Sequence, residues 1–267
     1  MNDIHASPYK LTFVSSGGGT NALSTLLKVP GASNTILESY VPYSKESMNK
    51  FLNKIPDHYC SLDTCLSMGA NAYKKSKEIS NNTKSKYLMG VSVTANLATT
   101  YQKKGDHKFF IVIQTSSFTK YLECFLKKGK RSRQDEEKLI TECVISLIAG
   151  TCGLDFPIPK IQEEINVEQI NAEKKWEKLF NNKVDFISNN KNLPELIFPG
   201  SFNPLHEGHI KMKELAEKKT GMHTTFEICA NNADKPPLTF YEIKRTIDQF
   251  QNDESWMLTS AGRFSEK

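Results

Sequence analysis

The sequence lacks a long apolar run, a paired cysteine motif and a strong net charge. Its 267 residues include six scattered cysteines and no C-x-x-C pair, so a structural zinc ribbon is not expected and reduced thiols are the simplest interpretation. No apolar stretch approaches the roughly 20 residues of a membrane-spanning helix. The start of the chain lacks a basic segment followed by an apolar one. We therefore expect a cytoplasmic protein without a secretory signal, a metal site or a membrane partner.

The composition fits a globular protein of one large or two modest domains. Hydrophobic residues make up 38% and charged residues 24% of the chain. The formal net charge of +5 suits a phosphorylated small molecule but is too small to indicate nucleic acid. The basic run from Lys127 to Arg133 lacks interleaved aromatic residues, so we expect it to be a solvated loop. The sequence leaves open a homo-oligomer.

Residues 8–152 alternate between short β-rich runs and amphipathic helical patterns, which predicts an α/β unit. Ser44 and Ser61 are good N-cap residues for two of its helices. The run from Phe109 to Gln114 is almost entirely apolar, so we expect a strand buried on both faces. The other strands are predicted at 11–14, 35–41, 88–93 and 118–125.

Residues 153–193 differ in composition and predict a helical linker. The segment from Ile161 to Phe180 is rich in charge with sparse apolar positions, and we interpret it as a connecting helix. A second α/β unit is predicted from Pro194 onward. Its strands are expected at 196–198, 225–230 and 256–259, and its helices at 210–219 and 240–250.

A ten-residue string from Gly200 to His209 is the most informative feature of the chain. It reads Gly-Ser-Phe-Asn-Pro-Leu-His-Glu-Gly-His and joins a short apolar run to a helical pattern. A strand, a tight turn and a helix start form an anion site, because free main-chain N–H groups and the helix dipole point into the turn. His206 and His209 are three residues apart, so one helical turn places both on the same side.

This string resembles the G-x-F-[DN]-P-x-H-x-G-H signature of the nucleotidyltransferase superfamily. The resemblance implies that His206 and His209 contact phosphates as catalytic residues. It implies that Gly200, Ser201, Phe202 and Asn203 line the nucleotide, and that Mg²⁺ arrives with ATP. The expected fold of this unit is Rossmann-like.

A loop further along favours one acceptor. The segment from Asn231 to Pro237 resembles the Asn-x-Asp-Lys-Pro-Pro loop of the eukaryotic nicotinamide-nucleotide adenylyltransferases. The resemblance implies a catalytic phosphate contact for Lys235 and a nucleotide contact for Asp234. A solvated turn is the alternative for both. The expected substrates are then ATP and nicotinamide mononucleotide, and the expected process is NAD biosynthesis.

The late superfamily motif, I-S-[ST]-T-x-x-R, is not found in the sequence. Residues 194–267 therefore correspond to the first half of a nucleotidyltransferase domain. We expect a bare strand edge and a bare apolar face there. The hypothesis of a truncated chain without turnover, which binds a nucleotide but does not react, stays open for this reason.

The N-terminal unit resembles the CinA C-terminal domain, a three-layer α/β fold with nicotinamide-mononucleotide amidohydrolase activity. The resemblance implies a site made of Ser16, Gly18, Gly19, Tyr43 and Thr94, with Ser16 at the nucleophile position. Met48 stands where the family has its activating lysine, which argues against hydrolysis because a serine needs an adjacent base. Amide hydrolysis at this site is the alternative function to adenylyl transfer.

Overall fold

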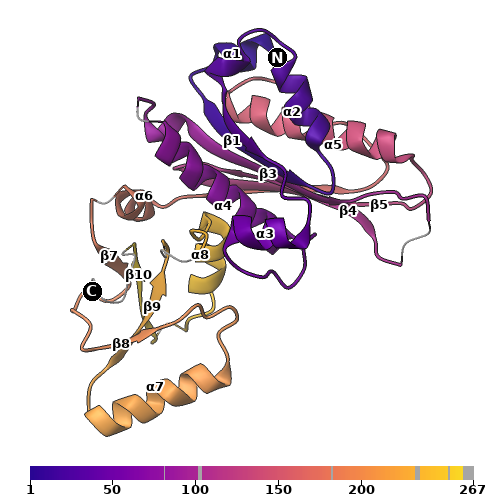
Figure 1. The fold of residues 1–267 in the computed structure, drawn as a ribbon. Helices are drawn as coiled ribbons and strands as arrows, with labels where there is room; N and C mark the ends of the chain where they lie inside the picture. Colours follow the sequence, from indigo (N-terminus) through magenta and orange to yellow (C-terminus); the bar gives the residue numbers. More distant parts are fainter. Residues whose placement is uncertain (81, 102–103, 182, 232–234, 252, 261–267) are drawn as a thin grey trace. The chain divides into compact units, whose positions relative to one another are not determined.

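The computed structural model describes all residues except 81, 102–103, 182, 232–234, 252 and 261–267 (Figure 1). The chain divides into two compact units, Met1–Ile170 and Asn171–Lys267. The division falls inside the segment 153–193. Both units contain a β-sheet and helices, which confirms the α/β fold class.

A six-stranded sheet of order β2-β1-β3-β4-β5-β6 forms the centre of unit 1. Strand β1 pairs in parallel with β2 and β3, whereas β3, β4 and β5 are antiparallel neighbours. The strands are β1 (Lys10–Ser16), β2 (Ile36–Tyr40), β3 (Leu88–Asn96), β4 (His107–Gln114), β5 (Phe118–Leu126) and β6 (Ile165–Asn171).

Helices cover both faces of this sheet, which gives three layers (Figure 1). Successive strand residues point to opposite faces. Phe13 belongs to a core with residues of α2 and α5, whereas Val14 packs with residues of α3 and α4. The helices are α1 (Asn2–Ala6), α2 (Thr20–Leu27), α3 (Lys45–Leu52), α4 (Leu62–Ile79) and α5 (Arg133–Thr151), with short 3-10 turns η1 (Ala32–Asn34) and η2 (Ser85–Tyr87).

Local sequence signals place most elements of unit 1. Ser44 and Ser61 cap α3 and α4 as predicted, because their side-chain oxygens accept from the main-chain N–H groups of Ser47 and Thr64. Ser132 and Asp135 form a reciprocal capping box at the start of α5. Strand β4 is buried along nearly its whole length, as its apolar run predicts.

A four-stranded sheet of order β7-β10-β9-β8 forms unit 2. Strands β8, β9 and β10 are parallel, and β7 is antiparallel to β10. Trp176 and Phe180 pack against Phe240 at ring-centroid distances of 6.2 and 5.3 Å, which joins α6 to α8. The elements are α6 (Lys174–Phe180), β7 (Phe186–Ser188), β8 (Leu196–Pro199), α7 (Glu207–Thr220), β9 (Thr224–Cys229), α8 (Phe240–Ile247) and β10 (Ser255–Thr259).

The predicted connecting helix over 161–180 is wrong. Its first half holds strand β6, and only 174–180 is helical. Strand β6 lies at the edge of the sheet, where Tyr121 of β5 donates a hydrogen bond to Glu168 and the Asn166 amide donates to Glu123. The polar side chains of β6 bind side chains of β5, so the segment is rich in charge although it is a strand. This charge-rich pattern led to the prediction of a helix. Helix α1 and strand β7 were not predicted.

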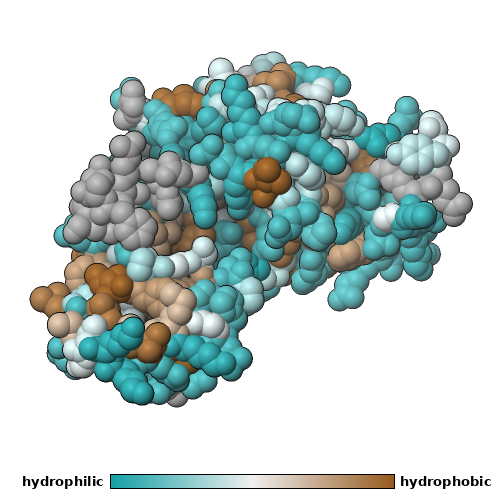
Figure 2. All heavy atoms as spheres, turned by 60° about the horizontal axis from the view of Figure 1, so that its bottom comes forward, coloured by the Kyte–Doolittle hydropathy of each residue, from teal (hydrophilic) through white to brown (hydrophobic). Residues whose placement is uncertain are grey.

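The face shown in Figure 2 is mostly hydrophilic, with apolar residues gathered at its lower left. In unit 2 the large exposed apolar side chains include Ile197 of β8 and Met212 and Leu215 of α7. Helix α7 buries none of its residues, and β8 pairs with β9 alone among the described strands. No helix in the described part of the chain is long and apolar enough to cross a membrane.

Acid should weaken the ion pair between Arg131 and Glu163 in unit 1. Arg131 holds Glu163 through two hydrogen bonds of 2.7 and 2.9 Å, and this contact lowers the pKa of Glu163 from 4.5 to about 2. A depressed carboxyl pKa stabilises the fold above pH 4.5, and this contribution is lost as the pH falls toward 2. Urea unfolding should therefore show a smaller stability difference between the wild type and Glu163→Gln at pH 3 than at pH 6. A constant difference across this range would contradict the prediction.

Candidate functional site

The predicted nucleotide turn lies directly after β8 in unit 2. The Gly200 N–H donates to the Glu227 carbonyl at 3.0 Å, which ties the turn to β9. Phe202 has a φ of +45° and is 1% exposed, and its ring packs 5.1 Å from Phe226 and 5.2 Å from His209. A Cβ atom at Gly200 would lie 2.5 Å from the Phe202 ring. The turn therefore requires glycine at this position and inserts an aromatic anchor below the histidines.

The two motif histidines lie together at the start of α7. Their rings are stacked with centroids 3.6 Å apart. The main-chain N–H of His206 donates a hydrogen bond to Nδ1 of the His209 ring at 3.3 Å. A Cβ atom at Gly208 would meet the His206 ring at 3.1 Å, so this glycine leaves room for the ring. His206 is exposed and His209 is half-buried. The sequence prediction that both rings share one side of the helix start is confirmed.

The surroundings of His209 favour its neutral form. Desolvation lowers its pKa from 6.5, and the neighbouring His206 lowers it further. Because Nδ1 accepts the His206 N–H, the single proton of the neutral ring is assigned to Nε2. His209 can therefore present an N–H donor near pH 7 without carrying a charge.

Arg245 of α8 and Gln249, which follows the helix, bind the turn, and sequence reasoning missed both. The Gln249 amide, just beyond the helix, donates to the Phe202 carbonyl at 3.0 Å and accepts the Leu205 N–H at 2.8 Å. Arg245 donates to Asn203 Oδ1 at 3.2 Å. These contacts join positions 42 to 47 residues apart, so no local pattern indicates them. They fix the turn and add a cation beside it.

The remaining predicted residues of unit 2 have different surroundings. Ser201 and Asn203 are exposed in the turn. Lys235 is exposed in the loop after β9, and no described contact brings it to the histidines. Asp234 lies outside the described residues. The proposed roles of Lys235 and Asp234 stay predictions.

In unit 1, the Gly-rich turn after β1 is occupied by a carboxylate of the chain itself. Glu137 of α5 accepts the main-chain N–H groups of Gly19 at 2.7 Å and Asn21 at 3.0 Å, and the Thr20 hydroxyl at 3.3 Å. Gly19 has a φ of +87°, and a Cβ atom there would lie 2.8 Å from the Val93 side chain. The helix start that could hold a phosphate therefore already holds an anion.

The five residues predicted for the CinA-like site are only partly brought together. Gly18 and Tyr43 line a hollow of about 230 Å³ together with Arg133 and Glu137. Ser16 and Thr94 are register partners in β1 and β3, but the Ser16 hydroxyl donates to the Pro42 carbonyl and the Thr94 hydroxyl to the Tyr59 carbonyl.

Met48 stands where the CinA family has its activating lysine, and neither of the two nearby lysines takes over the role of a base for Ser16. Met48 is 1% exposed in the core, and Lys45 and Lys50 of the same helix are exposed. Lys45 lies over the Tyr59 ring, 5.8 Å from its centroid. Among the described residues, no basic side chain is hydrogen-bonded to the Ser16 hydroxyl. The geometry therefore gives Ser16 no base.

Residues 197–260 match the model of a family described as cytidylyltransferase-like. This segment is a nucleotidyltransferase-superfamily domain. It contains the motif turn, α7, α8 and the strands that carry them.

Solved structures similar to the chain include three proteins of the competence- or damage-inducible group. The protein from Enterobacter asburiae has 14% identity and a TM-score of 0.45 over 56% of this chain and 92% of its own. The CinA superfamily protein from Enterobacter cloacae has 13% identity and a TM-score of 0.45 over 56% and 86%. The protein CihA from Agrobacterium tumefaciens has 15% identity and a TM-score of 0.41 over 55% and 94%. A search of curated proteins found no match.

The Glu137 carboxylate should stabilise unit 1 as a helix cap supplied from another helix. Glu137→Ala removes the acceptor of two main-chain N–H groups, so the free energy of unfolding should fall by about 1–2 kcal/mol. Glu78→Ala changes an exposed glutamate of α4 and should cost about 0.5 kcal/mol or less. Urea unfolding of both variants measures the difference, and equal effects would contradict the capping role.

The His209 ring should titrate below pH 6.5. In His206→Ala its pKa should rise, because the neighbouring charge and part of the desolvation are removed. Heteronuclear NMR of the histidine rings between pH 4 and 8 measures both values. A His209 pKa at or above 6.5 in the wild type would refute the assigned neutral state.

Proposed function

We propose that unit 2 binds a nucleoside triphosphate at the turn 200–209 and transfers its nucleotidyl group to a phosphorylated acceptor. The observation that carries the proposal is the pair of stacked imidazoles of His206 and His209 at the start of α7. Among the described residues, no acceptor is bonded to the main-chain N–H groups of Glu207 and Gly208 beside them. These donors and the helix dipole together favour a polyphosphate.

The reaction needs no covalent intermediate on the protein. A phosphate oxygen of the acceptor attacks the α-phosphorus of the triphosphate, a new P–O bond forms, and the bond from that phosphorus to the bridging oxygen breaks. Pyrophosphate leaves with that electron pair. The developing negative charge on the α-phosphate and the leaving group is what the imidazole N–H donors would stabilise. A neutral His209 with a proton on Nε2 suits this role.

For the substrates we propose ATP, which carries its Mg²⁺ into the site, and nicotinamide mononucleotide. The loop 231–237 supports this choice through its resemblance to the adenylyltransferase loop. Arg245, held beside Asn203, supplies an additional cation for a phosphate at the turn. The process served would be NAD biosynthesis in the cytoplasm.

His206→Ala tests the proposal. Calorimetric titration with MgATP measures binding, and chromatography measures the dinucleotide formed from ATP and nicotinamide mononucleotide. We expect the wild type to bind MgATP and the variant to lose product formation by about 10²- to 10³-fold, the usual cost of one transition-state donor. The control is His58→Ala, which removes an exposed histidine of unit 1. A wild type that does not bind MgATP, or an unchanged His206→Ala variant, would refute the proposal. Use of CTP in place of ATP would correct the nucleotide alone.

No observation favours the alternative function of amide hydrolysis. The Ser16 hydroxyl is bonded to a main-chain carbonyl, and Met48 is buried where a base would be required. The Glu137 carboxylate also takes the N–H groups that an anionic substrate would use in the Gly-rich turn. We therefore assign the chemistry to unit 2 alone.

A further inference from the structure

Unit 1 contains a second and larger hollow between the end of β3 and the start of α5. Its volume is about 640 Å³, which lies in the range of small-molecule sites. Its walls come from the loop 98–101 after β3, from His107 at the start of β4, and from the segment 128–133 that leads into α5.

A buried histidine–carboxylate pair forms part of this hollow. His107 Nδ1 lies 2.8 Å from Glu136 Oε1, and the other Glu136 oxygen accepts the Ala98 N–H at 2.6 Å. Glu136 is fully buried and His107 is 7% exposed. A buried carboxylate requires such donors, so Nδ1 carries a proton and the ring orientation is fixed. Among the described residues, no hydrogen bond occupies Nε2, and His107 lines the hollow.

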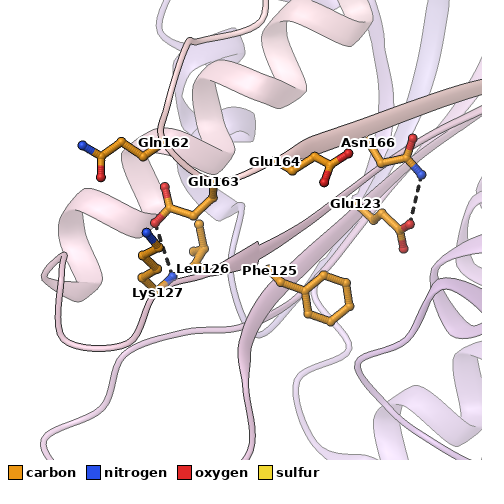
Figure 3. Close-up of a pocket in the computed structure, with 8 residues that line it drawn as sticks. All are labelled: Glu123, Phe125, Leu126, Lys127, Gln162, Glu163, Glu164 and Asn166. Atoms are coloured by element: carbon orange, nitrogen blue, oxygen red, sulfur yellow. Dashed lines mark hydrogen bonds between the residues drawn. The ribbon is translucent and has the colours of Figure 1, made fainter.

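The two arginines on the opposite wall of the hollow differ in whether a carboxylate compensates their charge. Arg131 is held by both oxygens of Glu163, a residue of the acidic hollow shown in Figure 3, so its charge is compensated. Arg133 instead donates to two main-chain carbonyls, of Ala98 at 3.2 Å and Gly17 at 3.0 Å. Carbonyl oxygens fix a guanidinium without cancelling its charge.

We propose that this hollow binds a small molecule that bears a phosphate group, with Arg133 as its main ionic contact and His107 as a second polar contact. The guanidinium offers a planar fork of donors that suits a phosphate. The neighbouring Gly-rich turn cannot supply this anion contact while Glu137 occupies its N–H groups.

Calorimetric titration of the full chain tests the site with ribose 5-phosphate, inorganic phosphate and uncharged ribose. We expect saturable binding of the two phosphate compounds at millimolar or lower concentration and no binding of ribose. Arg133→Gln should weaken binding at least tenfold. Arg133 is exposed, so this variant should remain folded. Lys84→Gln, which changes an exposed lysine elsewhere in unit 1, should leave the affinity unchanged.

NMR spectra of the histidine rings give a second readout. The His107 signals should shift on addition of ribose 5-phosphate, and binding should persist in His206→Ala, which separates this site from the motif of unit 2. The proposal is overturned if neither phosphate compound binds, if ribose binds equally well, if Arg133→Gln binds like the wild type, or if His206→Ala abolishes binding. Each of these results leaves the function proposed for unit 2 to its own test.

Discussion

Main-chain N–H groups at a helix start have no acceptor within the helix, and whether a turn can take an anionic ligand depends on how the chain satisfies them. In α2 the acceptor is a carboxylate, because Glu137 binds the N–H groups of Gly19 and Asn21. In α7 His206 and His209 form a capping box, in which the His209 ring accepts the main-chain N–H of His206, but among the described residues no acceptor is bonded to the N–H groups of Glu207 and Gly208. The same backbone requirement therefore closes one helix start and leaves the other open to a ligand.

This difference decides which glycine-rich turn is a candidate for nucleotide chemistry. Both turns follow a parallel strand and precede a helix, and both resemble turns that bind phosphorylated substrates. In unit 1 the anion is already present as a side chain, and the one hydrogen-bond partner of the Ser16 hydroxyl in the described part of the chain is a carbonyl oxygen. In unit 2 two imidazoles share the helix start, and one of them has a lowered pKa that keeps it a neutral donor. The turn of unit 2 is therefore a better candidate for a group-transfer site than the turn of unit 1.

The sequence predicted those features that local residues determine. The caps at Ser44 and Ser61, the buried run of β4 and the placement of His206 and His209 all depend on neighbours within a few positions. The missed contacts are distant in sequence. Glu137 lies 118 residues from Gly19, and Gln249 lies 47 residues from Phe202. Edge strand β6 was missed because its polar side chains pair with β5, and a single sequence does not reveal such pairing.

The first turns of α5 explain why these missed contacts occur together. Four residues of the segment 131–137 reach four different parts of unit 1. Arg131 holds Glu163 before β6, Arg133 holds the carbonyls after β1 and β3, Glu136 holds His107, and Glu137 caps α2. The two arginines precede three acidic residues, and each of these four side chains binds an opposite charge, a histidine or main-chain dipoles. One helix start therefore sets the shape of the hollow beside His107, and it also blocks the Gly-rich turn. The basic run 127–133, which the sequence pattern predicts to be a solvated loop, therefore leads into a helix start that ties several parts of unit 1 together.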